Sequence, residues 1–168
     1  MTVTTQESVQ YENAFTDSPP VMNPVSAWNG KLQLQYFEHD QDGAGDATSS
    51  VAICKLPAGR VRVILGLSRA YINWTTSSAT LDLGWDAYEG LDGVTVAADP
   101  DGLVDGLAVD TVNTYGFDVH ATLPAAIRAT GGTKVFTSKA GVIIRATSQD
   151  VAIVSGDDLA GYLAFLCD

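Results

Sequence analysis

The stretch Lys31-Leu32-Gln33-Leu34-Gln35-Tyr36 alternates polar and apolar residues without interruption. A period of two predicts a β-strand with one apolar side and one solvent-facing side. The stretch Arg60-Val61-Arg62-Val63-Ile64 repeats the pattern after Leu56-Pro57-Ala58-Gly59. In that turn sequence proline presets φ, and glycine accepts a positive φ. The sequence after residue 30 therefore predicts a β protein.

Shorter runs of the same character continue along the chain, separated by turn sequences such as Asp42-Gly43-Ala44-Gly45-Asp46. These runs are Leu81-Asp82-Leu83, Val94-Thr95-Val96, Gly141-Val142-Ile143-Ile144-Arg145 and Val151-Ala152-Ile153-Val154. The β-branched residues of Gly141–Arg145 favour a more buried strand. Short strands spaced by turns predict one all-β sandwich or barrel, and we find no βαβ alternation.

The end of the chain is compatible with two structures. Leu159, Tyr162, Leu163 and Leu166 are spaced as on one face of a helix. Gly161 and the shortness of the segment argue against a helix. We expect a strand from Tyr162 to Leu166.

The composition changes near residue 30 and divides the 168 residues into an arm, 1–29, and a β-sandwich domain, 30–168. The arm contains three of the six prolines and no glycine, lysine or arginine. Proline favours an extended path and gives no donor to a ladder. The segment shows neither helical nor alternating period, so we expect an extended N-terminal arm.

Large apolar residues in the arm distinguish it from a purely solvated tail. A frayed terminus is the alternative. If a partner covers the arm, the candidate contact residues are Tyr11, Phe15, Val21, Met22 and Trp28.

The chain has 20 acidic and 9 basic residues, a formal net charge of −11. Such a charge repels phosphate and anionic lipid, so we expect neither nucleic acid nor a membrane as partner. The first basic residue is Lys31, and no apolar run approaches the roughly 18 residues of a bilayer span. These features predict synthesis in the cytoplasm without a secretory signal. Cys54 and Cys167 are expected to be buried free thiols.

Few residues suggest chemistry. His39 and His120 are the two histidines, and Ser68 lies in Gly66-Leu67-Ser68-Arg69-Ala70, one residue short of a nucleophile-elbow motif. That motif requires a strand-to-helix turn, whereas strand-like sequence continues here on both sides. We therefore expect structural roles for all three residues and no catalytic site.

Two further groups of residues have an alternative functional interpretation. The segment Asp99-Pro100-Asp101-Gly102-Leu103-Val104-Asp105-Gly106 offers carboxylates for a hard cation such as Ca²⁺, but it lacks the EF-hand spacing. We expect an acidic turn facing water and assign no metal or cofactor.

Trp74, Trp85, Tyr71 and Tyr88 could form an aromatic platform for a sugar. Ile72 and Trp74 share one strand face, opposite Tyr71, so Trp74 is expected in the core.

The order of the motifs resembles that of small head-associated structural proteins of tailed phages. It is carried by Leu56-Pro57-Ala58-Gly59-Arg60-Val61, Thr80-Leu81-Asp82-Leu83-Gly84-Trp85 and Asp99–Gly106, with Gly30-Lys31 before the first strand and Tyr162-Leu163-Ala164-Phe165-Leu166 at the end.

This resemblance implies a capsid decoration or cement protein. It implies a jelly-roll-like antiparallel β-sandwich with an extended N-terminal arm, forming a homo-trimer on the outer surface of the virion. The major capsid protein would be its partner, and the arm would reach neighbouring subunits. The alternative function is a carbohydrate- or receptor-binding β-sandwich module of a virion.

Overall fold

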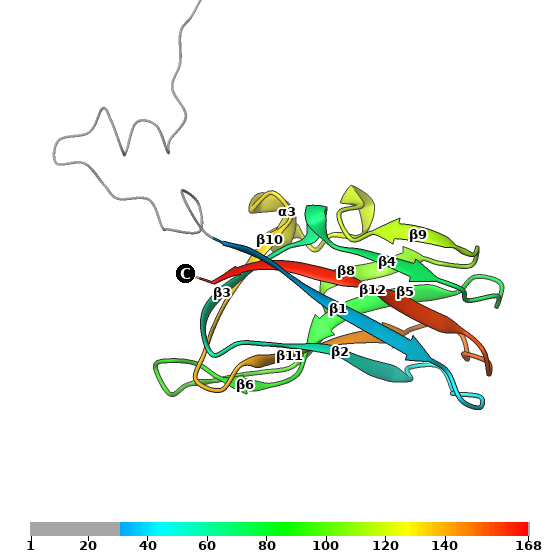
Figure 1. Cartoon of the computed structure of the whole chain (residues 1–168), viewed down its shortest axis with the longest axis horizontal. Helices are drawn as coiled ribbons and strands as arrows, with labels where there is room; N and C mark the ends of the chain where they lie inside the picture. Colours follow the sequence, from blue (N-terminus) through cyan, green and yellow to red (C-terminus); the bar gives the residue numbers. More distant parts are fainter. Residues whose placement is uncertain (1–30, 168) are drawn as a thin grey trace, which may run out of the picture.

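The computed structural model describes residues 31–167, which form two large β-sheets packed face to face and a separate two-stranded sheet (Figure 1). The arm, 1–29, and its proposed contact residues lie outside the described residues. The strands are β1 (Leu32–Asp40), β2 (Ser50–Leu56), β3 (Gly59–Ile64), β4 (Arg69–Ile72), β5 (Thr80–Trp85), β6 (Tyr88–Glu89), β7 (Thr95–Val96), β8 (Asp99–Ala108), β9 (Asn113–Gly116), β10 (Thr133–Ser138), β11 (Val142–Ser148) and β12 (Asp158–Cys167). Short helical turns are η2 (Leu65–Leu67), η3 (His120–Thr122) and α3 (Ala125–Ala129).

The first sheet has four rows, because β3 and β4 form one row interrupted by η2, and β10 and β9 form the next. The rows run β1, β12, β3/β4 and β10/β9, with β1 at one edge. The second sheet has the order β2-β11-β5-β8, with β8 at an edge. All these pairs are antiparallel.

The strand order is that of a jelly roll. The first row in sequence, β1, pairs with the last, β12, and β2 pairs with β11. The β3/β4 row pairs with the β10/β9 row, and β5 pairs with β8. The chain thus folds as one long hairpin wound into two sheets, which is the jelly-roll arrangement. The expected all-β, antiparallel sandwich of jelly-roll type is confirmed.

Apolar side chains from both sheets fill the space between them. Leu163 of β12 and Val63 of β3 come from one sheet, and Leu83 of β5 and Ile144 of β11 come from the other, and all four are fully buried. At roughly 25 cal/mol per Å² of apolar surface removed from water, this burial is the main stabilising contribution to the fold.

Most of the strands expected from the sequence are present, and the C-terminal segment is a strand, as expected. Val151–Val154 is a correction, because it forms a loop in which Ile153 makes one isolated bridge with Gly45. Ile153 is buried, so its hydrophobicity serves core packing without a ladder. Asp99–Gly106 is a second correction: it belongs to strand β8, not to a turn. Aspartate and proline are tolerated in β8 because it is an edge strand.

A candidate interaction surface on strand β1

Strand β1 turns its apolar residues away from the core. Leu32, Leu34 and Tyr36 are 50%, 59% and 65% exposed, and we call these three side chains the β1 face. The opposite side of the strand carries Gln35 and the buried Phe37. The alternation in the sequence therefore predicts the strand correctly, but the apolar side of this strand is the solvent-facing one.

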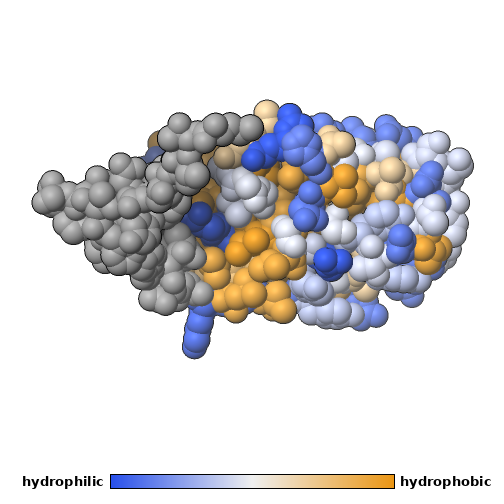
Figure 2. Space-filling model, turned by 90° about the horizontal axis from the view of Figure 1, so that it is seen from above, coloured by the Kyte–Doolittle hydropathy of each residue, from blue (hydrophilic) through white to orange (hydrophobic). Residues whose placement is uncertain are grey.

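The register of β1 on β12 shows what lies beside the β1 face. Leu32 pairs with Leu166, Leu34 with Ala164 and Tyr36 with Tyr162. Leu166 and Ala164 are buried, so the exposed apolar surface here comes mainly from β1. Figure 2, which views the molecule from above, shows hydrophobic side chains gathered at its surface.

Beyond Tyr36, the exposed side chains along β1 are polar and acidic. Tyr36 donates a hydrogen bond from Oη to Glu38 Oε2 over 3.1 Å. This hydrogen bond raises the pKa of Tyr36 above its ordinary value of 10.0, with smaller contributions from burial and from the charge of Glu38. A cavity of about 290 Å³ lies at the C-terminal end of β1. It is lined by Glu38, His39, Asp40, Tyr71, Asp158 and Ala160.

The other edge of β1 pairs with no strand within residues 31–167. In an antiparallel ladder every second residue turns both its N–H and its C=O away from the partner strand. An unpaired edge of this kind is a template for another extended chain. The β1 face and this edge together form the best candidate site in the described part of the molecule.

Ser68 has a structural role. It is fully buried between η2 and β4, and its Oγ donates a hydrogen bond to the carbonyl of Ile64 over 2.8 Å. The same oxygen accepts a hydrogen bond from the backbone N–H of Ala164 over 2.9 Å. The serine thus replaces a ladder bond where η2 interrupts the row beside β12.

The two histidines lie apart from Ser68 in the hydrogen-bond network of residues 31–167. His39 Nε2 lies 3.1 Å from Gln41 Oε1. His120 belongs to η3 and lines a cavity of about 240 Å³ with Gly66, Asp118 and Arg128. The described residues offer no serine–histidine hydrogen bond for nucleophilic catalysis.

Trp74 and Trp85, the two tryptophans among residues 31–167, lie in the core, as expected for Trp74. Trp74 and Trp85 are each only 6% exposed. Trp85 donates from Nε1 to the carbonyl of Ala97 over 3.1 Å and packs edge-on against Phe136. Lys134 Nζ lies 4.6 Å above the Trp85 ring. Neither indole offers a free face on which a sugar could stack.

Aspartates lie on both sides of the contact between β5 and β8. Asp82 of β5 accepts a hydrogen bond from the N–H of Gly106 over 2.7 Å. Burial raises the pKa of Asp82 above its ordinary 3.8, this hydrogen bond lowers it in part, and nearby aspartates raise it further. Burial and then the hydrogen bond with Asp101 also raise the pKa of Asp99. Within residues 31–167 no cluster of three or more His, Cys, Asp or Glu residues is arranged to hold a metal.

Both cysteines are free. Cys54 is buried, as expected, and its burial raises the pKa of the thiol to about 12. Cys167 is only half-buried, which corrects the expectation of two buried thiols, and its Sγ lies 3.6 Å from Gln33 Nε2.

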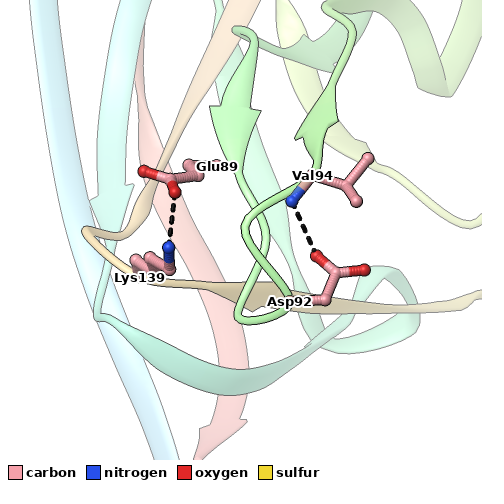
Figure 3. Close-up of polar contacts among 4 residues, drawn as sticks. All are labelled: Glu89, Asp92, Val94 and Lys139. Atoms are coloured by element: carbon pink, nitrogen blue, oxygen red, sulfur yellow. Dashed lines mark hydrogen bonds and ion pairs between the residues drawn. The ribbon is translucent and has the colours of Figure 1, made fainter.

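A second, smaller exposed apolar area lies at the tip of the β6–β7 hairpin. Leu91 and Val94 are 54% and 61% exposed. Figure 3 shows how the hairpin is held: Asp92 Oδ1 accepts a hydrogen bond from Val94 N–H, and Glu89 pairs with Lys139 of the turn after β10. Because the turn satisfies its own polar groups and has charged neighbours, it is a weaker docking candidate than β1.

No helix among residues 31–167 has the length and hydrophobicity needed to cross a membrane. No protein-family model matches the chain, and no curated protein matches it in sequence.

Two solved structures, those of the Gx and Gt strains of infectious bursal disease virus, are similar to this chain, with TM-scores of 0.41 and 0.42 and sequence identities of 11% and 12%. Each similarity covers 82% of this chain and 32% of the other, so the chain spans about a third of the length of the structures it matches.

Proposed function

We propose that this chain is a structural protein of a tailed-phage particle, a decoration or cement protein that binds the outer surface of the assembled head. The observation that carries the proposal is the β1 face, where Leu32, Leu34 and Tyr36 stay exposed directly after the arm. Exposed apolar residues are ordinary when isolated. Three together on one strand mark a surface for protein contact.

The burial of two tryptophans supports this proposal over its alternative. Jelly rolls occur in viral capsid domains and in lectins, and the fold alone does not choose between them. The aromatic platform considered for a sugar would include Trp74 and Trp85, and both are buried. The exposed aromatics of the first sheet, Tyr36 and Tyr71, lie beside apolar or acidic groups on a surface suited to protein.

The arm supplies the second half of the proposed contact. Tyr11, Phe15, Val21, Met22 and Trp28 would insert between neighbouring capsomers and bridge them. Several linked copies raise avidity, because each later contact becomes intramolecular. The resemblance implies three copies. A protein that binds the assembled shell and not its free subunits stabilises the shell by mass action.

Co-sedimentation with purified, undecorated heads of the same phage tests the proposal. We expect the full chain to pellet with the heads and to raise the temperature at which they open. Failure of the full chain to bind either heads or mature virions would refute a capsid role.

Two matched variants test the arm separately. In the first, Tyr11, Phe15, Val21, Met22 and Trp28 become alanine; in the second, the polar arm residues Thr2, Gln6, Gln10, Asn13 and Thr16 become alanine. We expect the first variant to bind heads at least about tenfold more weakly, because large apolar anchors carry most of the energy of a protein contact. The second should bind like the unmodified chain. Equal binding by both variants would show that the arm is not a contact element.

A further inference from the structure

Residues 32–37 of strand β1 lack the sequence features that keep an edge strand from pairing with another chain. It runs for nine residues, all in unbroken register with β12. It contains no proline, no glycine and no bulge, and residues 32–37 carry no charge. Regular, uncharged, apolar edges of this kind are sites of edge-to-edge association.

We propose that two copies of this chain associate through β1, which pairs antiparallel with β1 of the second copy about a two-fold axis. The two first sheets then become one continuous sheet across the pair. This inference goes beyond the proposed capsid function and does not depend on it. Identical edges that pair antiparallel are related by a two-fold axis. The strand thus favours a dimer over the trimer that the resemblance implies.

The order of side chains on β1 selects the register. With Leu34 opposite Leu34 of the second copy, Leu32 of each copy lies opposite Tyr36 of the other. This register brings the two β1 faces together into one apolar row, with Gln33 opposite Gln35 on the other side of the ladder. A shift by two residues in one direction would place Leu32 opposite Glu38, and a shift in the other direction would move Tyr36 beyond the start of β1 in the second copy.

The charges favour the same arrangement. Each copy carries a net charge of −11, so most surfaces of two copies repel one another. Residues 32–37 are an uncharged segment of the surface, with Lys31 before them and Glu38 and Asp40 after them. Antiparallel pairing brings the acidic end of one β1 to Lys31 of the other, whereas parallel pairing would align the acidic ends.

Sedimentation of the full chain over a range of concentrations tests the dimer. We expect a monomer–dimer equilibrium in which Leu34→Lys weakens association at least about tenfold, because it places two like charges directly opposite one another. The matched control is Val94→Lys, which adds the same charge at an equally exposed position on the β6–β7 hairpin. It should leave association nearly unchanged. Because Leu34 is exposed, both variants should melt like the unmodified chain when monomeric.

Salt provides an independent check of the charge argument. We expect dimerisation to strengthen between about 0.05 M and 0.5 M NaCl, because screening reduces repulsion between two acidic copies while the apolar row is unaffected. A dimer held by ion pairs would weaken instead, which would contradict the β1 contact.

Cross-linking tests the register. Leu34→Cys in a Cys167→Ser background should form a disulfide-linked dimer on mild oxidation. Residues opposite one another in an antiparallel ladder have Cα atoms about 4.5–5.5 Å apart, within the range of a disulfide. Leu91→Cys in the same background should form no disulfide-linked dimer. The buried Cys54 is a poor competitor because its thiol has a raised pKa.

Three results would overturn the proposal. The first is a chain that stays monomeric at millimolar concentration, and the second is a trimer that Leu34→Lys leaves intact. The third is a dimer lost on deletion of residues 1–29 with no cross-link at position 34, which would identify the arm of a neighbouring copy as the occupant of the β1 edge.

Discussion

The edge strands β1 and β8 lie in different sheets of the same jelly roll and differ in almost every feature that controls association. β8 has Asp99, Asp101 and Asp105, a proline at position 100, and two irregularities in its register with β5. Natural edge strands use charge, proline and bulges to resist pairing with other chains. β1 has an unbroken register and three exposed apolar side chains. The contrast teaches that the β8 edge is protected, whereas the β1 edge stays unpaired among residues 31–167.

A substitution that disrupts the close approach of β8 to β5 has the largest expected effect on stability. A Cβ at Gly84 would lie 2.0 Å from the carbonyl oxygen of Asp99, so the backbone of β8 must move. We expect Gly84→Ala to lower the free energy of unfolding by about 3 kcal/mol, as overpacking against rigid backbone does. Urea denaturation measures this loss.

Gly66→Ala is the matched control, because its Cβ would meet no atom closer than 3.7 Å. It should change the free energy of unfolding by no more than about 0.5 kcal/mol. Equal effects at Gly84 and Gly66 would show that β8 does not hold this close packing. Neither variant should change self-association through β1.

The hydrogen bond between Ser68 and β12, the strand that pairs with β1, is the second feature. Ser68→Ala removes the acceptor of the Ala164 N–H and leaves that buried donor without a partner. We expect a loss of about 2 kcal/mol in the free energy of unfolding, the usual cost of an unsatisfied buried group. Ser77→Ala, at an exposed serine, is the control and should cost far less. If Ser68 were a nucleophile instead, the variant would lose an activity while its stability stayed the same.

Much of the fold follows from local sequence, but the pairing does not. The period of two around Leu32 and Val61 identifies strands, and Gly161 argues for the C-terminal strand. The jelly-roll order depends on contacts such as Leu32 with Leu166, which lie at opposite ends of the domain. No local pattern encodes such a register, and here the expectation of a jelly roll came from the resemblance alone.

The exposure of the β1 face also could not be predicted from local sequence. Alternation places Leu32, Leu34 and Tyr36 on one side of β1, but the sequence does not say which side the second sheet covers. That depends on the position of β1 at an edge. Asp99–Gly106 was expected in a turn because aspartate and proline are rare in central strands, and only its place at an edge makes it a strand.

Giving β1 a feature of β8 tests the comparison directly, with an intermediate effect. Leu34→Asp puts one carboxylate on the exposed β1 face, as in β8. We expect association to weaken at least about tenfold, or roughly 1.4 kcal/mol, because like charges then lie opposite one another. The unfolding of the monomer should not change, since Leu34 is 59% exposed. Sedimentation and thermal melting separate the two quantities. A large drop in melting temperature would mean that Leu34 contributes to the core and not to an interface.

The partly buried carboxylates at the contact between β5 and β8 have a cost in stability, which predicts the smallest effect. Burial raises the folded-state pKa of Asp82, and burial together with the Asp101 hydrogen bond raises that of Asp99. The folded state therefore binds more protons than the unfolded state in the pH window that starts near 3.8 and ends at each raised pKa. The contribution of these groups to stability is full below this window and is lost as the pH rises through it.

Asp82→Asn isolates this effect, because the amide oxygen can still accept the Gly106 hydrogen bond without a buried charge. We expect the variant to melt at a higher temperature than the unmodified chain at pH 7, with a difference that shrinks as the pH falls toward about 4. Asp42→Asn, at an exposed turn aspartate, should show no such trend. If the Asp82→Asn difference were the same at both pH values, the Asp82 carboxylate would not be the source of the cost in stability.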